Sequence, residues 1–325
     1  MTATATGFAA ADDSRFGPLV RRFAEALARL NPAGGKVGLA VSGGPDSMAM
    51  LLLAHAAIPG EFEVATVNHG LRPEAAEECA LVERACAERG ISCAVLQVQL
   101  DEGNLQAEAR RARYAALADW ALERGLAAVA TAHHADDQAE TLLMRLNRGS
   151  GVAGLAGVRE RTMIASTSVS LLRPLLSFRR AELARIVEEE GLAPAQDPSN
   201  QDDRFDRVRL RKALAESALL DPSALAMSAA HLADAEEALD WAARREWDEQ
   251  VQVSAEQVRY CPQAPRAVAL RVVERAIAQL GRAPRGGDVA RLLDALLVGE
   301  GGNVGGVLVR VQGDAWVFRP EPPRR

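Results

Sequence analysis

Several features are scarce in this chain of 325 residues, and each scarcity excludes a class of protein. The four cysteines show no CxxC spacing and are too few for a disulfide-stabilised scaffold. The apolar run from Met48 to Ile58 includes His55 and is too short to span a bilayer. The N-terminus lacks a basic region followed by an apolar core. These absences predict a cytoplasmic protein without membrane attachment.

Lysine is almost absent, because Lys36 and Lys212 are the only two in the chain. A composition bias towards arginine and alanine is the favoured interpretation of this absence, and selection for phosphate binding is the alternative. The formal net charge of −6 argues against attraction of nucleic acid to the whole surface, although a local basic patch can still bind it. The hydrophobic content of 48% can support a substantial core, and the length favours two domains.

The most informative segment present is KVGLAVSGGPDSMAMLLLA, from Lys36 to Ala54. Its pattern predicts a strand, a glycine-rich loop and a helix, and free N–H groups at a helix N-terminus favour a bound phosphate. Proline is well suited to the first turn of that helix. The Walker A pattern GxxxxGKS/T is absent. The loop resembles the SGGxDS signature of the PP-loop ATP pyrophosphatases. This resemblance implies that the phosphates of ATP are bound by Ser42, Gly43, Gly44, Pro45, Asp46 and Ser47.

A carboxylate beside a phosphate requires a cation between them. Asp46 is therefore expected to bind Mg²⁺ together with the phosphates. The alternative is an ordinary turn between a strand and a helix, which the combination of two glycines, two serines and an aspartate disfavours.

Strand and helix patterns alternate from residue 16 onwards, with glycine at helix ends and proline at helix starts. This order predicts an α/β fold with a doubly wound parallel sheet, whose ligands bind beyond the carboxyl ends of the strands. We expect a disordered tail at 1–15, a nucleotide-binding catalytic domain at 16–217, and a mostly helical substrate-binding or nucleic-acid-binding domain at 218–325. The last domain is predicted to end in a β-hairpin, because residues 306–319 alternate apolar side chains around Gly313 and Asp314.

The segment TAHHADDQAET, from Thr131 to Thr141, follows a predicted strand. If it begins a helix, His133, Asp137 and Glu140 share one face with Thr141. A divalent metal site and an acidic helix end stabilised by the helix dipole are the alternatives. No third histidine or cysteine lies nearby to complete a zinc site, so no structural metal is expected.

Two arginine-rich segments are candidates for contacts with phosphate. Arg110 and Arg113 lie on adjacent turns of a predicted helix, where surface ion pairs are the more common role of arginine. The segment from Asp197 to Lys212 suits a nucleic-acid backbone or a triphosphate, and an exposed amphipathic helix explains its charge equally well. Its candidates for nucleic-acid binding are Arg204, Arg209, Arg211 and Lys212.

Read together and in order, the motifs resemble the bacterial tRNA(Ile)-lysidine synthetases, a family of PP-loop ATP pyrophosphatases. The resemblance covers roughly residues 37–214 and rests on VSGGPDS, VNHGLRPEA, NLQAEARRARY, HHADDQAET, RGSGVAGLAG, RPLL and DPSNQDDRFDRVRLR. It implies ligation of free L-lysine to C2 of the wobble cytidine in tRNA(Ile) with a CAU anticodon. ATP first adenylates the cytidine, and lysine then displaces AMP. The sequence leaves a homodimer open.

The resemblance also implies roles for individual residues. The expected catalytic residues are Asp46, Asp137, Arg113 and Arg207, and the candidates for binding lysine or another substrate group are His133, Asp137, Glu140 and Arg110. The chain departs from the family pattern at Gln106 and Val208, where glutamate and asparagine are common, so a charge role at the first and a polar contact at the second are in doubt. A tRNA thiolase of the same fold and a non-catalytic nucleotide-binding module are the rival functions.

Overall fold

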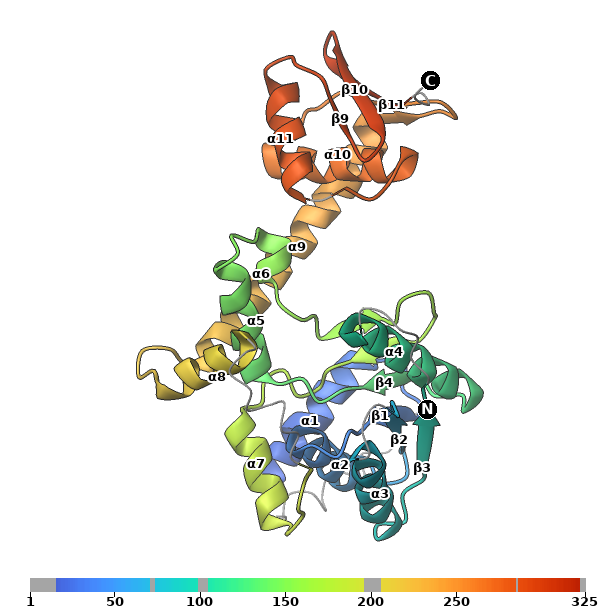
Figure 1. The fold of residues 1–325 in the computed structure, drawn as a ribbon, viewed down its shortest axis with the longest axis vertical. Coiled ribbons are helices and arrows are strands. Elements are labelled where there is room, and N and C mark those ends of the chain that lie inside the picture. The colour runs from blue at the N-terminus through green and yellow to red at the C-terminus, as the bar shows by residue number, and fades with distance from the viewer. Residues whose placement is uncertain (1–15, 71–73, 99–104, 196–205, 285, 322–325) are drawn as a thin grey trace, which may run out of the picture. The chain divides into compact units, whose positions relative to one another are not determined.

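The computed structural model describes residues 16–70, 74–98, 105–195, 206–284 and 286–321 (Figure 1). The chain divides into two compact units, Met1–His231 and Leu232–Arg325. The predicted domain boundary lay between residues 217 and 218, whereas the compact units divide between residues 231 and 232, inside one long helix. The predicted tail at 1–15 lies outside the described residues.

The first unit contains a six-stranded sheet in the order β3-β2-β1-β4-β6-β5. All neighbouring strands are parallel except β5 and β6, which pair antiparallel. This arrangement confirms the predicted parallel α/β sheet and adds an antiparallel edge that the prediction did not include. The strands are β1 (Val37–Ala40), β2 (Phe62–Asn68), β3 (Cys93–Gln97), β4 (Ala128–Ala130), β5 (Arg161–Met163) and β6 (Ser170–Leu172).

Helices cover both faces of this sheet (Figure 1). The helices of the unit are α1 (Gly17–Leu30), α2 (Pro45–Ala57), α3 (Glu74–Ala87), α4 (Leu105–Glu123), α5 (Ala135–Leu146), α6 (Val152–Leu155), α7 (Arg180–Glu189) and α8 (Asp206–Glu216). Side chains of α1, α2, α3 and α7 form one buried core with the sheet, while α4 packs on the opposite face. Alternate strand residues enter the two cores, since Leu39 joins the first and Val129 the second.

Two close approaches explain why particular residues stand in this unit. Residues Met48 to Ala54 of α2 are all buried, as expected for a helix that is apolar on every side and packs against both the sheet and other helices. On the opposite face Trp120 of α4 lies directly over Gly38 of β1. A Cβ atom at Gly38 would come within 2.4 Å of the indole ring, so only glycine fits there.

The second unit is built on a five-stranded antiparallel sheet in the order β7-β8-β11-β10-β9. The hairpin predicted around Gly313 is confirmed as β10 and β11, with Gln312 opposite Ala315. The unit is less helical than the sequence indicated, because β7, β8 and β9 escaped prediction: each has only three residues. The elements are α9 (Pro222–Gln250), β7 (Val251–Val253), β8 (Val258–Tyr260), α10 (Arg266–Leu280), α11 (Gly286–Leu297), β9 (Gly302–Val304), β10 (Val307–Gln312) and β11 (Ala315–Pro320).

The core of the second unit lies between one face of this sheet and helices α10 and α11. Tyr260 and Trp316 meet there edge to face, with ring centroids 5.5 Å apart. Among the described residues, no helix combines the length and apolarity that crossing a bilayer requires.

Candidate active site

The loop between β1 and α2 has the backbone of an anion-binding turn. Gly43 has a φ of +83°, a conformation that strongly favours glycine, and Pro45 occupies the first helical turn as predicted. The hydroxyls of Ser42 and Ser47 lie 3.3 Å apart, and the Ser47 hydroxyl also accepts the Ser42 N–H and donates to the Gly44 carbonyl. These contacts fix the loop in a shape that leaves the N–H groups of the first turn of α2 for a ligand.

A buried histidine connects this loop to the start of α5. The His134 side chain is fully buried, and its Nε2 lies 3.4 Å from Asp46 Oδ2 and 3.6 Å from Asp137 Oδ2. Burial favours the neutral ring, but the carboxylates of Asp46 and Asp137 outweigh it and raise the pKa of His134. One imidazole therefore holds the two predicted catalytic carboxylates together.

Asp137 and Glu140 extend this arrangement along α5 and share one arginine. Arg207 donates from its Nε to Glu140 Oε2 at 2.7 Å and from Nη2 to Asp137 Oδ1 at 2.9 Å. Burial acts to raise the pKa of Asp137, and the charges of His134 and Arg207 reverse this, so the pKa lies below its usual value. Asp137 is therefore a carboxylate at neutral pH.

Glu140 is only 1% exposed and is occupied by arginines. Besides Arg207 it receives Arg211 Nε at 2.9 Å and lies 3.5 Å from Arg180 Nη2. Both of its oxygens are engaged, which gives Glu140 the role of holding Arg207 and Arg211 in place. The same contact turns Arg211, a candidate for tRNA binding, towards a buried carboxylate.

His133 precedes α5, which begins at Ala135, so it does not share a helical face with Asp137 as the sequence suggested. Its Nδ1 lies 3.0 Å from the Thr131 hydroxyl. Burial, reinforced by the charges of Arg173, Arg110 and Arg113, lowers the pKa of His133 to about 4, although Asp137 opposes this. His133 is therefore a neutral imidazole at physiological pH.

The remaining candidates are distributed more widely. Arg110 and Arg113 lie on α4 close to Tyr114, with their guanidinium carbons 5.1 Å and 5.3 Å from its ring centroid. Arg209 is exposed and pairs with Asp206, and Lys212 is exposed on the same helix. Arg204 lies outside the described residues, as does the side chain of Gln106. Val208 is buried, so a polar contact with a ligand is not its role.

Sequence reasoning missed several residues of this site. His134 stands beside His133 in HHADD, and a helix starting at Ala135 would have identified it as the residue preceding the first turn. Arg173 of RPLL is buried beyond β6, a strand too short to be read from its three residues. Arg180 and Tyr114 carried no signal by themselves, because arginine and tyrosine on helices usually serve packing or surface ion pairs.

The fold and the loop define a class, and a comparison with protein families agrees. A model of the PP-loop domain matches residues 18–218, which is most of the first unit. The chain is thus a PP-loop protein, a class that uses ATP.

Curated relatives narrow the class. A tRNA(Ile)-lysidine synthase from Novosphingobium aromaticivorans is 50% identical over 309 residues, covering 94% of this chain and 94% of the relative. Another from Zymomonas mobilis is 38% identical and covers 95% of this chain and 96% of the relative. The chain belongs to the tRNA(Ile)-lysidine synthase family.

A solved structure supports the fold. The U34-tRNA thiolase NcsA from Methanococcus maripaludis, solved with its 4Fe-4S cluster, superimposes with a TM-score of 0.55. The match covers 67% of this chain and 78% of the thiolase at 18% identity. It supports a shared fold and carries no argument about the chemistry.

Proposed function

We propose that this chain ligates free L-lysine to C2 of the wobble cytidine in tRNA(Ile) with a CAU anticodon, using ATP. Family membership supports the reaction, and one structural observation carries the site assignment. His134 brings Asp46 of the phosphate loop and Asp137 of α5 to a single imidazole nitrogen. The carboxylate of the phosphate loop and a carboxylate suited to a cationic amine therefore lie in one site.

In the first step the cytidine O2 attacks the α-phosphorus of ATP, and the bond to pyrophosphate breaks. The loop from Ser42 to Ser47 binds the leaving pyrophosphate through its backbone N–H groups and hydroxyls. Arg113 lies close enough to His69, at the end of β2, for its charge to act on that histidine. Burial lowers the pKa of His69, and the charge of Arg113 lowers it further. Arg113 is accordingly assigned to the phosphates, where a fixed positive charge stabilises the developing negative charge.

In the second step the ε-amine of lysine attacks C2, AMP leaves, and one proton is released. Free lysine carries an ammonium with a pKa of about 10.4, so the site must attract the cation and then accept its proton. Asp137, an ionised carboxylate, is assigned to the ε-amine. Arg207 holds one of its oxygens and His134 lies beside the other, which orients the carboxylate. Glu140 is assigned to positioning Arg207.

Mg²⁺ fits Asp46. Its Oδ1 is buried and accepts no hydrogen bond within the part of the chain that the structure describes. In the same part of the chain no group of three or more His, Cys, Asp and Glu side chains can hold a metal ion. A single carboxylate together with substrate phosphates is a common way to bind Mg²⁺. The ion, when bound, neutralises phosphate charge.

The reaction is tested with purified protein, ATP, radiolabelled lysine and a tRNA(Ile) transcript bearing the CAU anticodon. Label is expected to enter the RNA only when ATP is present. The matched control is the same transcript with uridine at the wobble position, which should remain unlabelled. Labelling of the uridine transcript, or sulfur transfer in place of lysine, would contradict the proposal.

We place the reaction in the cytoplasm, where the substrates occur together.

The role of Asp137 is tested by Asp137→Asn, with Asp136→Asn as its neighbouring control. Asp136 accepts the Arg180 N–H at 2.8 Å and pairs with Arg179, so it anchors α7. It also lies 3.7 Å from Nδ1 of His134, so Asp136→Asn removes a carboxylate beside the same ring without removing the one assigned to the amine, and it should retain most of the lysine incorporation. Loss of a group that acts on the amine is expected to lower lysine incorporation about 100-fold or more. Pyrophosphate release should fall much less. Equal activity of Asp137→Asn and wild type would remove Asp137 from the lysine site.

A further inference from the structure

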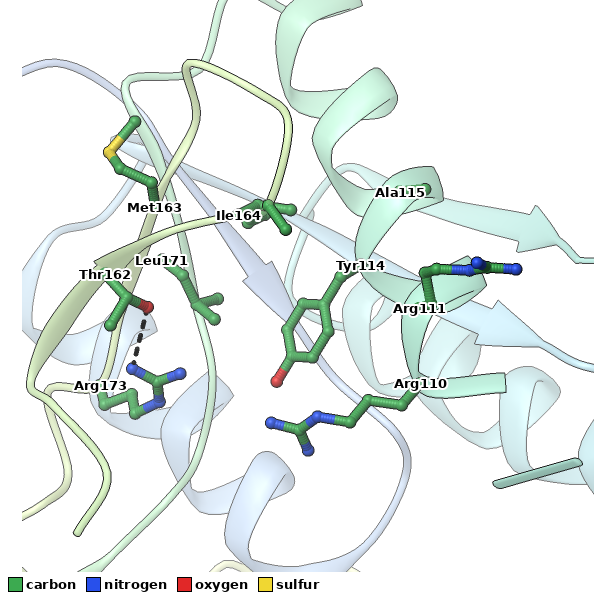
Figure 2. A pocket seen from close by; sticks show the side chains of 10 residues that line it. Arg110, Arg111, Tyr114, Ala115, Thr162, Met163, Ile164, Leu171 and Arg173 are labelled. Carbon is green, nitrogen blue, oxygen red and sulfur yellow. Dashed lines mark hydrogen bonds between the residues drawn. The ribbon is translucent and has the colours of Figure 1, made fainter. Parts of the chain in front are cut away.

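A cavity of about 380 Å³ opens between α4 and the β5–β6 edge of the first sheet (Figure 2). Its size lies within the range of about 300–1,000 Å³ that small-ligand sites occupy. The cavity is separate from the phosphate loop and from Asp137, which the proposed function assigns to ATP and to lysine. Arg110, which the sequence offered as a candidate for binding lysine or another substrate group, lines it.

The cavity is cationic. Arg110, Arg111 and Arg173 line it, and no acidic side chain is among its lining residues in the described part of the chain. Arg111 is paired with Glu108 at 3.2 Å. Arg110 has no carboxylate partner among the described residues and approaches only the Tyr114 ring. The surplus positive charge therefore comes from Arg110 and Arg173.

Arg173 is an unusual arginine because it is 5% exposed and faces no carboxylate in the described residues. Its Nη1 donates to the Arg159 carbonyl and to Thr162 Oγ1, while its Nε has no partner in the described structure. Burial lowers the pKa of Arg173. A buried guanidinium with an unused donor is costly without an anion, which points to a ligand that supplies one.

Tyr114 adds a second unused donor to the same wall. Its hydroxyl is buried without a hydrogen-bond partner in the described structure, and Figure 2 shows it pointing between the guanidinium groups of Arg110 and Arg173. Two guanidinium groups on either side of a phenol hydroxyl match the oxygens of a phosphate group. The opposite wall is apolar and includes Ile164 and Leu171.

The position of the cavity along the sheet indicates whether its phosphate comes from ATP or from the RNA substrate. The phosphate loop follows β1, and β4 and β6 separate β1 from β5. The cavity therefore lies on the far side of β4 from the strands β2 and β3. The charges of Arg173 and Arg110 nevertheless act on His133 at the end of β4, so the cavity borders the reacting centre.

We propose that this cavity binds a nucleotide of the RNA substrate. Its phosphate contacts Arg110, Arg173 and the Tyr114 hydroxyl, and its base packs against the apolar wall. The inference rests on the proposed function for the identity of the RNA. It names a site for the RNA that is separate from the site for ATP.

The test measures two dissociation constants for each variant, one for the anticodon stem-loop of tRNA(Ile) and one for ATP. Arg110→Gln is expected to weaken RNA binding about tenfold and to reduce the dependence of log K on log salt by roughly 0.7–0.9. Tyr114→Phe removes one hydroxyl and should weaken RNA binding about threefold. Both variants should bind ATP within a factor of two of wild type.

Arg124→Gln is the matched control. Arg124 follows the other end of the same helix and pairs with Glu63, which retains Lys36 when Arg124 is removed. The same loss of charge there should leave RNA binding unchanged. Three outcomes overturn the proposal: weaker ATP binding with unchanged RNA binding, no change in either, or an equal loss in the control. Failure of wild-type protein to incorporate lysine, with these RNA effects intact, would overturn the proposed function alone.

Discussion

Two of the four buried glutamates among the described residues, Glu140 of the first unit and Glu246 of the second, are satisfied in opposite ways. Glu140 of the first unit is 1% exposed and is surrounded by the guanidinium groups of Arg180, Arg207 and Arg211. Glu246 of the second unit is 8% exposed and accepts neutral donors at one oxygen. Those donors are the Tyr260 hydroxyl at 3.0 Å and the backbone N–H groups of residues 263 and 264 at 2.9 Å and 3.1 Å.

We interpret this difference in hydrogen-bond partners as the difference between a functional carboxylate, Glu140, and a structural one, Glu246. Three positive charges around the negative charges of Glu140 and Asp137 leave an excess of one. The arginines are 28–45% exposed, so they can also meet an anionic substrate. Neutral donors around Glu246 leave no excess and connect α9 to the loop after β8. We infer that Glu140 positions charge for the reaction, whereas Glu246 stabilises the second unit.

Among these glutamates, Glu140→Gln has the largest expected effect. An amide cannot accept from all three guanidinium groups, and its own N–H₂ would face one of them. Arg207 would then lose its fixed position beside Asp137, and lysine incorporation is expected to fall about 100-fold, as when a positioning contact is lost. The measurement is the initial rate per folded molecule, with folding checked by circular dichroism. A rate within threefold of wild type would contradict a positioning role.

The same substitution in the second unit, Glu246→Gln, is expected to act on stability. Weakening three hydrogen bonds to a buried carboxylate should lower the free energy of unfolding by about 2 kcal/mol. Three of the four tryptophans, Trp241, Trp247 and Trp316, lie in this unit, so urea unfolding followed by fluorescence reports on it. Lysine incorporation below the unfolding transition should match wild type. A loss of activity as large as that of Glu140→Gln would remove the distinction between the two glutamates.

The sequence predicted the parts of this molecule whose signals are local. The loop from Ser42 to Ser47, the order of strands β1 to β4 and the hairpin at Gly313 all follow from residue types within a few positions of one another. Asp46 and Asp137 were also identified as candidates from their motifs.

Features that depend on residues far apart in the sequence escaped prediction. Glu140 was expected to bind lysine, yet its surroundings are set by Arg180, Arg207 and Arg211, which are 40, 67 and 71 residues away. No periodicity in α5 reveals that three guanidinium groups converge on that carboxylate. The strands β5 to β9 were missed for a related reason, because three-residue strands are fixed by their pairing partners rather than by their own pattern.

Glu182 provides the intermediate case and the smallest expected effect. It accepts one guanidinium, Arg22 Nη2 at 2.8 Å, and one backbone N–H, that of Arg179 at 2.8 Å, at the start of α7. Burial acts to raise the pKa of Glu182, and Arg22 with the Arg179 N–H lowers it below its usual value. Because the folded pKa lies below the unfolded value of about 4.3, the stabilisation is complete above that pH and is lost as the pH falls through the folded pKa.

Both partners of this pair are about one third exposed, so Glu182→Gln should lower the free energy of local opening by only about 1 kcal/mol at pH 7. Hydrogen exchange of the α7 amides measures that opening. The gap between wild type and variant should shrink as the pH falls from about 4.3 through the folded pKa, because both carry a neutral side chain below that pKa. Lysine incorporation should not change. A gap that persists in acid would show that packing of the side chain, and not its charge, holds the start of α7. A loss of lysine incorporation would place Glu182 with Glu140, and the count of guanidinium groups around a buried carboxylate would no longer separate functional from structural glutamates in this chain.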